Sequence, residues 1–475
     1  MNQKFCFVLL TAVIVFICCA VYPLVLSPRS TSLRLPQVRS YQSSSSVSNT
    51  TTQHATLRHT AIAIKRSPTS LVTPTSYLSL AKKNCTSPLT TLVFIKTHKT
   101  GSSTLQTIVN RFGFFHNLSF VFNKTSSKNG HFYGTLYGTL IKSPKEFLLP
   151  PLKVKYKDYK NYIYDMLAVH MRYNRKNMDM LMKTGCRYIT IIREPAAQWE
   201  SAFEEFMFQD AFSKAPTIRK DRRIETFLMK PEYYRDILKT TKYEGMAGRR
   251  YYYAQNSQIY DLGLDIKDFK NDTIINATIR RLGKEFNMIL LAEYFDESLV
   301  ILAKELCWEF EDIVYIKKNS REDRRNLSDE VRQKVSTWNH ADVLLYDYFN
   351  KTLWRKVKEY GPTFEEDLKY FRQLNSNIFK QCANANLTYE KLNKKRTKHV
   401  EFTPKENSSQ FCNTVAEHKK VLFDRVYRRQ IPKTKPSSAI PQRVNTRKIS
   451  SARNRTQRLK RPKLEHKPKK RIKKH

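Results

Sequence analysis

Nine consecutive residues, Lys96 to Thr104, carry side chains that suit the binding of an anion. They read Lys-Thr-His-Lys-Thr-Gly-Ser-Ser-Thr, so two ammonium groups and a glycine stand among hydroxyls. Ammonium groups and hydroxyls donate hydrogen bonds to phosphate oxygens, and a glycine lets the backbone approach a ligand closely. We therefore predict a phosphate site at this turn, with charge supplied by Lys99. The alternative is an ordinary surface turn that contains lysines.

The elements on either side of the turn agree with this prediction. Thr91–Ile95 is a short apolar run rich in β-branched residues, which predicts a buried strand. Apolar side chains then recur at helical spacing, which predicts a helix that begins near Ser102 and ends at Gly113. The first backbone N–H groups of a helix lack partners within it and attract anions, as does the helix dipole. In a Walker A loop the lysine follows the last glycine, but here Lys99 precedes Gly101, so the turn is of another kind.

A second pair of residues follows another predicted strand, Cys186–Ile192. Arg193 comes directly after this strand, and Ser201 lies eight residues later, about two turns into the next predicted helix. Alone, an arginine and a serine at this spacing are weak evidence of a site. Their meaning depends on whether the fold brings them to the lysine-containing turn.

The rest of the body alternates between strands and helices. Further strands are predicted at Phe286–Leu291 and Asp312–Ile316, and helices from Asp296 to Leu306 and from Ser328 towards Tyr360. Such alternation predicts an α/β fold, a three-layer sandwich with a mostly parallel sheet.

The N-terminal region predicts a membrane anchor. Phe5–Leu26 contains no charged residue and is long enough to cross a bilayer. A cleaved signal peptide with Ala20 near its cleavage site is the alternative. Eleven Asn-X-Ser/Thr sequons follow this segment, which favours a lumenal body and a type II orientation. Five cysteines, an odd number, also follow it, so at least one is expected to remain outside an intramolecular disulfide.

Composition divides the chain into five segments. We predict that residues 1–4 are a short cytoplasmic tail, 5–26 the span, 27–88 a lumenal stem rich in Ser, Thr and Pro, 89–387 the globular domain, and 388–475 a basic, disordered tail. The chain has a net charge of +43. Residues 391–475 hold 28 Lys and Arg against 5 Asp and Glu, a net +23. This charge indicates an anionic partner, but the span and the sequons argue against nucleic acid.

Taken together, these stretches resemble the galactose 3-O-sulfotransferase family. The resemblance is carried by FIKTHKTGSSTL, LLAEYFDESLVIL, LCWEFEDIVYIKKNSR and FNKTLWRKVKEYG, and it covers about residues 92–382. It implies a P-loop-like sulfotransferase fold in a single-span Golgi enzyme. Such an enzyme transfers sulfuryl from 3′-phosphoadenosine 5′-phosphosulfate to the 3-hydroxyl of a terminal galactose, on a glycolipid or glycan acceptor, without a metal.

The resemblance also assigns roles. The 5′-phosphosulfate is expected on the backbone N–H groups of Thr100, Gly101, Ser102, Ser103 and Thr104. Lys99 is expected to neutralise the leaving oxygen, with Lys96 as a second cation. Arg193 and Ser201 are expected to hold the 3′-phosphate. His170, in the segment VHMRYN, is the predicted general base, and His98 is the next candidate.

Other functions remain open at this point. A lumenal carbohydrate-binding protein that keeps the fold without turnover is the main alternative, because a fold does not fix a function. A nucleotide-dependent kinase is disfavoured by the order of residues in the turn. The sequence does not distinguish among glycolipid, N-glycan and O-glycan acceptors.

Overall fold

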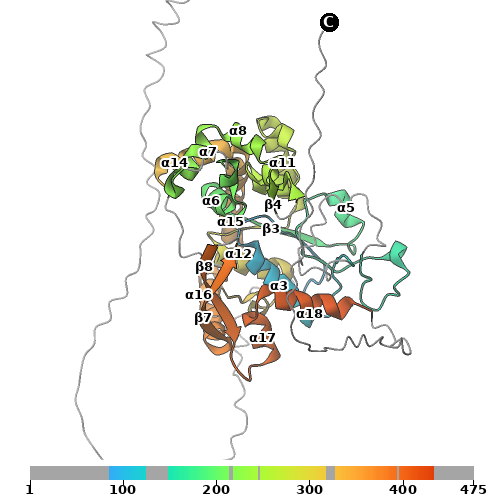
Figure 1. Ribbon diagram of the computed structural model, residues 1–475. Coiled ribbons are helices and arrows are strands. Elements are labelled where there is room, and N and C mark those ends of the chain that lie inside the picture. Colours follow the sequence, from blue (N-terminus) through green and yellow to red (C-terminus); the bar gives the residue numbers. More distant parts are fainter. Residues whose placement is uncertain are drawn as a thin grey trace, which may run out of the picture. The chain divides into compact units, whose positions relative to one another are not determined.

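The computed structural model describes residues 85–124, 148–212, 218–243, 246–316, 327–392 and 395–432 (Figure 1). The predicted cytoplasmic tail, the membrane span and nearly all of the stem lie outside these ranges, as do residues 433–475. Within the described ranges, every helix is too short or too polar to cross a bilayer.

A parallel sheet forms the centre of the described part. Its four strands lie in the order β2-β1-β3-β6. They are β1 (Leu92–Ile95), β2 (Met166–Leu167), β3 (Arg187–Ile192) and β6 (Met288–Leu291). All their residues except Arg187 are buried, which explains why the strands read as continuous apolar runs. The predicted α/β fold with a mostly parallel sheet is confirmed.

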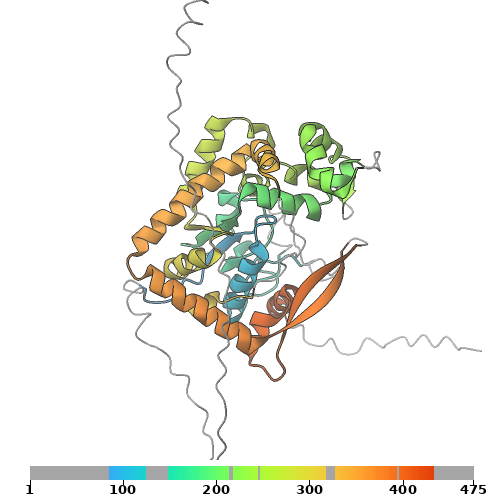
Figure 2. The ribbon, with the colours of Figure 1, turned by 90° about the vertical axis from the view of Figure 1, so that its left-hand side faces the viewer.

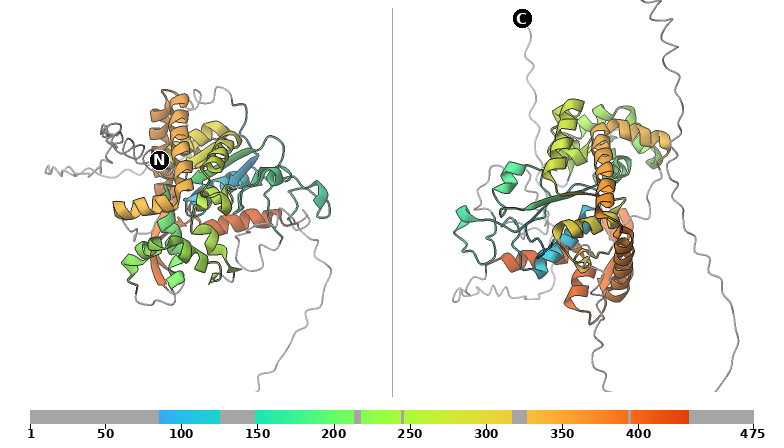
Figure 3. Two further views of the ribbon diagram at one scale, coloured as in Figure 1. Left: turned by 90° about the horizontal axis from the view of Figure 1, so that it is seen from above. Right: turned by 180° about the vertical axis from the view of Figure 1, so that it is seen from behind.

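The connections leave the two central strands in opposite directions. From β1 the chain passes through α3 (Ser102–Phe115) to β2 at one edge, whereas from β3 it passes through α6 (Pro195–Glu205) and α11 (Asp272–Glu285) to β6 at the other. Because parallel crossovers are right-handed, these helices cover opposite faces of the sheet, as Figure 3 shows for α3 and α11. The carboxyl ends of β1 and β3 therefore meet where the strand order reverses, which is the usual ligand-binding position in α/β sheets.

Further helices surround this centre. They are α5 (Arg175–Asp179), α7 (Arg223–Met229), α8 (Pro231–Ile237), α9 (Arg249–Tyr253), α10 (Ser257–Asp261), α12 (Phe295–Leu306), α13 (Phe310–Ile313), α14 (Asp329–Trp338), α15 (His340–Tyr360) and α16 (Phe364–Cys382). A short antiparallel pair, β4 (Lys242–Tyr243) and β5 (Met246–Ala247), precedes α9. The helix predicted to begin at Ser328 is capped by that residue, whose side chain accepts a hydrogen bond from the N–H of Val331.

Two local predictions were wrong. Gly113 does not end α3, which continues to Phe115; the glycine is needed because a Cβ there would lie 2.4 Å from the Phe120 ring. Asp312–Ile316 is not a strand. The carbonyl oxygens of Asp312 and Val314 accept hydrogen bonds from Arg111, so side chains rather than a neighbouring strand satisfy this backbone.

The predicted disorder of residues 388–475 was also wrong for the described part of that segment. The folded chain continues through β7 (Ala383–Leu392), β8 (Lys395–Pro404), α17 (Gln410–Ala416) and α18 (Lys419–Gln430). Figure 2 shows β7 and β8 as a two-stranded ribbon separate from the parallel sheet. Buried Leu422, Phe423 and Val426 give α18 an apolar face. This face is hidden in the sequence among basic residues.

Two disulfides connect distant parts of the described chain. Cys85 is bonded to Cys307, and Cys382 to Cys412. The remaining cysteine of the described residues, Cys186, forms no disulfide there, in agreement with the odd count. Cys85 lies within the predicted stem, but its disulfide joins it to Cys307 at the end of α12. The folded region therefore begins before residue 89.

Candidate functional site

The turn after β1 is held in shape by its own side chains. The hydroxyl of Thr97 donates to the carbonyl oxygen of Ile191 on β3, and the hydroxyl of Thr100 lies 2.8 Å from that of Thr97. The hydroxyl of Ser102 donates to the carbonyl oxygen of Thr97 at 2.6 Å. The hydroxyl hydrogen of Ser102 is therefore already donated to an acceptor within the turn. Ser102 offers a ligand its backbone N–H, as predicted, but not its hydroxyl hydrogen.

The start of α3 is open towards a ligand. Its N-cap is Gly101, which has a φ of 81° and is exposed. Glycine adopts this left-handed conformation at little cost and has no side chain to bond the first N–H groups of the helix. Lys99 also has a positive φ, 62°. The turn thus has the geometry of an anion site at a helix N-terminus.

Lys96 and His170 are in direct contact. The Nζ of Lys96 lies 3.0 Å from Nε2 of His170 and 3.3 Å from the hydroxyl of Ser103. Burial lowers the pKa of Lys96 well below its usual range, and the nearby charges of Lys419 and Lys99 lower this pKa further. Lys96 is therefore not a strand-end lysine in solvent.

The contacts of His170 define its tautomer. Its Nδ1 lies 3.0 Å from the carbonyl oxygen of Lys96, which can only accept a hydrogen bond, so Nδ1 carries the hydrogen. The Nε2 lone pair then faces the Lys96 ammonium. A neutral His170 has the lone pair that a base needs, but Lys96 must give up this contact before Nε2 can accept a proton from a substrate.

His98 is held by a carboxylate that the sequence did not predict. Its Nδ1 donates to Asp261 at 2.7 Å, and its backbone N–H donates to the same oxygen at 2.9 Å. Its ring stacks on that of His170, with centroids 4.3 Å apart, and lies tilted against the ring of Tyr253, with centroids 4.2 Å apart. An imidazole oriented by a buried carboxylate through Nδ1 presents Nε2 as its acceptor, which is the usual arrangement of a histidine base.

Lys99 forms an ion pair with Glu205, at the end of α6. The Nζ–Oε2 distance is 2.9 Å, and the Lys99 side chain is 26% exposed. The contact is partly open to solvent, so an anionic ligand with several oxygens can compete with this single carboxylate for the ammonium.

The loop after β3 brings Arg193 to the same place. Its Nη1 lies 3.4 Å from the carbonyl oxygen of Lys99, and its Nε lies 3.9 Å from Glu293. Gln258 fixes the backbone of Arg193: its side chain accepts from the Arg193 N–H at 2.7 Å and donates to the Arg193 carbonyl at 2.9 Å. Burial raises the pKa of the Glu293 carboxyl. The fold therefore brings Arg193 to the lysine-containing turn.

One face of helix α6 lies towards the turn that follows β1. Gln198 donates to the carbonyl oxygen of His98 at 2.8 Å, and Glu205 contacts Lys99. Ser201 lies three residues after Gln198 and four before Glu205, so it shares this face. The structure thus brings Ser201 to the site, together with the residues from Lys96 to Thr104, His170 and Arg193.

Several site residues were missed from the sequence. Asp261, Gln258 and Glu205 belong to no motif, and only folding brings them close. Asp342 of α15 accepts hydrogen bonds from the N–H groups of Gln258 and Ile259, and burial raises its pKa to about 7. Metal chemistry was not predicted. In the described ranges, no three or more His, Cys, Asp and Glu side chains gather as metal ligands would.

Comparison with known proteins agrees with this geometry. The chain belongs to the galactose-3-O-sulfotransferase family, whose model matches residues 42–410. It is 32% identical to mouse galactose-3-O-sulfotransferase 3 over 300 residues, which is 61% of this chain and 63% of that protein. It is 31% identical to mouse galactosylceramide sulfotransferase over 299 residues, 62% of this chain and 64% of that protein. The alignments thus span somewhat less than two thirds of these relatives.

The position of Arg193 leads to a first prediction. Replacing Arg193 by alanine should raise KM for a nucleotide donor with a 3′-phosphate and change kcat little, because a contact remote from the reacting atom stabilises ground and transition states alike. Steady-state kinetics with a donor that lacks the 3′-phosphate provides the control. If wild type and Arg193→Ala discriminate equally between the two donors, Arg193 does not bind that phosphate.

Proposed function

We propose that this protein transfers sulfuryl from 3′-phosphoadenosine 5′-phosphosulfate to the 3-hydroxyl of a terminal galactose. The observation that carries the proposal is the meeting of two loops at one point of the sheet. The guanidinium of Arg193 lies 3.4 Å from the Lys99 carbonyl, beside the open start of α3. A donor that carries phosphates on both the 5′ and the 3′ oxygen of its ribose requires two neighbouring anion sites. The names of the relatives support the same activity.

The residues present fit this donor. The N–H groups at the start of α3 bind one phosphate, and Arg193, with Ser201 on the facing helix, binds the other. The donor supplies the sulfuryl group, which passes in line from the leaving phosphate oxygen to the attacking oxygen. Lys99 exchanges Glu205 for the leaving oxygen and neutralises the charge that grows there. Lys96, held next to Ser103 and His170, adds a second cation. We also propose that the fold is a three-layer, P-loop-like sulfotransferase fold.

A sugar hydroxyl needs a base, and two histidines qualify. His170 remains the proposed base because its Nδ1 is fixed by a backbone carbonyl and its Nε2 bears a lone pair. His98 is a second candidate, supported by its bond to Asp261. The rings stack on each other, so both lie close enough to the turn to serve. Variants of His170 and of Asp261 distinguish between the two histidines.

We further propose a Golgi location with the catalytic region in the lumen and residues 5–26 as the anchor. The two disulfides support an oxidising compartment. Sequon asparagines also suit glycosylation, since those at positions 117, 271, 276 and 407 are exposed.

An acceptor panel tests the function. The full chain, purified in detergent, would be incubated with labelled sulfate donor and with galactosylceramide, a galactose-terminated N-glycan or a galactose-terminated O-glycan. The proposal expects label on the 3-hydroxyl of galactose in at least one acceptor, and galactosides already blocked at that hydroxyl serve as controls. Donor binding without transfer to any galactoside would instead favour a carbohydrate-binding protein without turnover.

A further inference from the structure

The C-terminal segment packs along α3, the helix that starts at the proposed donor site. Helix α17 begins near the far end of α3, where Phe411 lies beside Phe115, with ring centroids 6.3 Å apart. The guanidinium of Arg111 lies 5.7 Å from the centre of the Phe411 ring. Helix α17 therefore starts beside the end of α3 that is farther from the proposed donor site.

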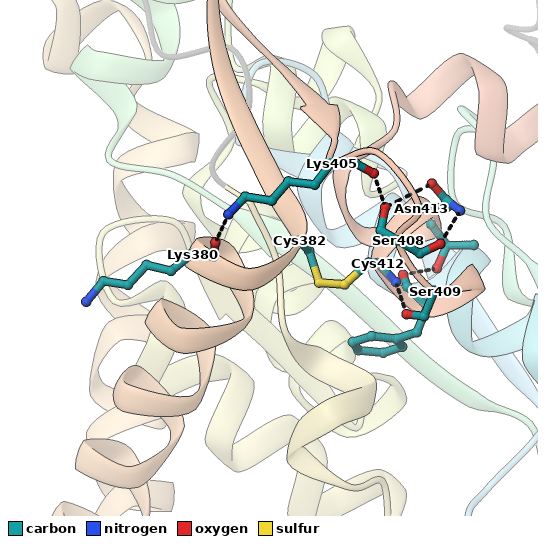
Figure 4. Close-up of a disulfide and its surroundings, with 9 residues drawn as sticks. Lys380, Cys382, Lys405, Ser408, Ser409, Cys412 and Asn413 are labelled. Carbon is teal, nitrogen blue, oxygen red and sulfur yellow. Dashed lines mark hydrogen bonds between the residues drawn. A yellow bond between two sulfur atoms is a disulfide. The ribbon is translucent and has the colours of Figure 1, made fainter. Parts of the chain in front are cut away.

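A disulfide and a group of hydrogen bonds hold α17 in place (Figure 4). Cys412, in the first turn of α17, is bonded to Cys382 at the end of α16. Ser409 caps α17 by accepting from the N–H of Cys412 at 3.2 Å. Lys405 donates to the carbonyl oxygen of Lys380 at 2.7 Å. The segment that precedes α18 is therefore firmly attached to the folded domain.

Helix α18 then ends where α17 began. Arg429 donates to the carbonyl oxygens of Phe114 and Leu118, and Gln430 exchanges two hydrogen bonds with the backbone of Phe120. Arg429 comes ten residues after Lys419, and Phe114 comes eleven residues after Ser103, so at about 1.5 Å per residue the two helical paths have similar lengths. Because α18 packs against α3 and both helices end together, we infer that Lys419, at the start of α18, lies beside the start of α3.

The electrostatics of Lys96 agree with this position of Lys419. Of the charges that act on Lys96, that of Lys419 lowers the Lys96 pKa most, ahead of Lys99. Helix stability does not account for a cation at this position. The first turn of α18 begins with Lys419 and Lys420 and has no acidic residue, although a helix N-terminus favours negative charge.

We propose that Lys419 is a further donor-binding residue, whose ammonium contacts the phosphosulfate group held at the start of α3. This inference rests on the proposed function and adds a residue outside the segment that resembles the family. It means that the C-terminal helix completes the donor site, with Lys96, Lys99 and Lys419 around one multivalent anion. The attraction between Lys419 and the bound anion offsets the unfavourable interaction of the Lys419 ammonium with the helix dipole.

Calorimetry with the full chain and 3′-phosphoadenosine 5′-phosphosulfate, without acceptor, tests the inference. Lys419→Ala and Lys419→Gln should weaken binding by about 10-fold or more, the usual effect of losing a hydrogen bond to a charged group. Lys419→Arg should retain most of the affinity. The matched control is Lys420→Ala, which removes the same charge from the next, exposed residue and should bind like wild type.

Four outcomes are distinguishable. If wild type does not bind the donor, the proposed function fails. If wild type binds and both Lys419→Ala and Lys419→Gln bind equally well, the inference fails while the function stands. Thermal unfolding separates binding from folding: removal of a cation from a helix N-terminus should leave Tm unchanged or raise it. A weaker affinity with an unchanged Tm therefore supports a contact with the donor. A lowered Tm for every Lys419 variant, with affinity restored at low temperature, would overturn it.

Discussion

Replacing Lys99 by alanine is expected to lower kcat by about 100-fold or more while the protein remains folded. The Lys99 ammonium lies at the open start of α3, where the proposed mechanism develops charge on the leaving oxygen. Removing one such preorganised charge from a transition state has an effect of about this size. Single-turnover kinetics with saturating donor measures the chemical step directly.

Glu205→Ala is the matched control for this variant. It removes the other half of the ion pair and leaves Lys99 in place. If Lys99 only anchored α6, the two variants would lose activity equally. We expect Glu205→Ala to retain kcat and to bind the donor at least as tightly as wild type, because the donor no longer competes with a carboxylate. Near-normal kcat in Lys99→Ala would remove this lysine from the mechanism.

The second large effect is expected for the general base. His170→Ala should lower kcat by about 10²- to 10⁴-fold, the range typical of a positioned base, and should change donor affinity little. A base acts only while it is unprotonated, so the acidic limb of the pH–rate profile should flatten in the variant. A pH–rate series on wild type and variant, with calorimetry of the desulfated nucleotide, measures both properties.

The alternative base has a distinct signature. If His98 accepts the proton, Asp261→Asn should lower kcat strongly, because the amide cannot hold the same tautomer through Nδ1. If His170 is the base, Asp261→Asn should mainly disturb the turn, through the lost bond to the His98 backbone N–H. His170→Ala with full activity and an intact acidic limb would transfer the role to His98.

The sequence predicts those parts of the site that are local. The strand before Lys96, the turn and the start of α3 follow from residues that are neighbours in the chain, so periodicity and glycine chemistry suffice. Arg193 could be brought to this turn because a parallel sheet aligns the carboxyl ends of its strands. Asp261 and Gln258 could not be predicted, since their partners lie 65 residues or more away and they match no motif.

Composition misled us about the C-terminal segment. Its basic residues masked the apolar face of α18, whose buried side chains alternate with arginines and lysines. Likewise, β2 is only two residues long, too short to give a period, and its place beside β1 is fixed by tertiary packing. Asp312–Ile316 has the residues of a strand, but Arg111 satisfies its carbonyl groups instead. In each case a contact between distant residues outweighed the local pattern.

The bond between Cys85 and Cys307 has a consequence for the unfolded protein. The two cysteines are 222 residues apart, and every strand of the parallel sheet lies between them. Closing so long a loop removes much of the conformational entropy of the denatured chain, worth about 5 kcal/mol in the chain-entropy model. A chain synthesised in a reducing environment would lack this constraint. Oxidation of this one pair therefore favours folding of the whole sheet, together with the turn after β1, before any ligand is bound.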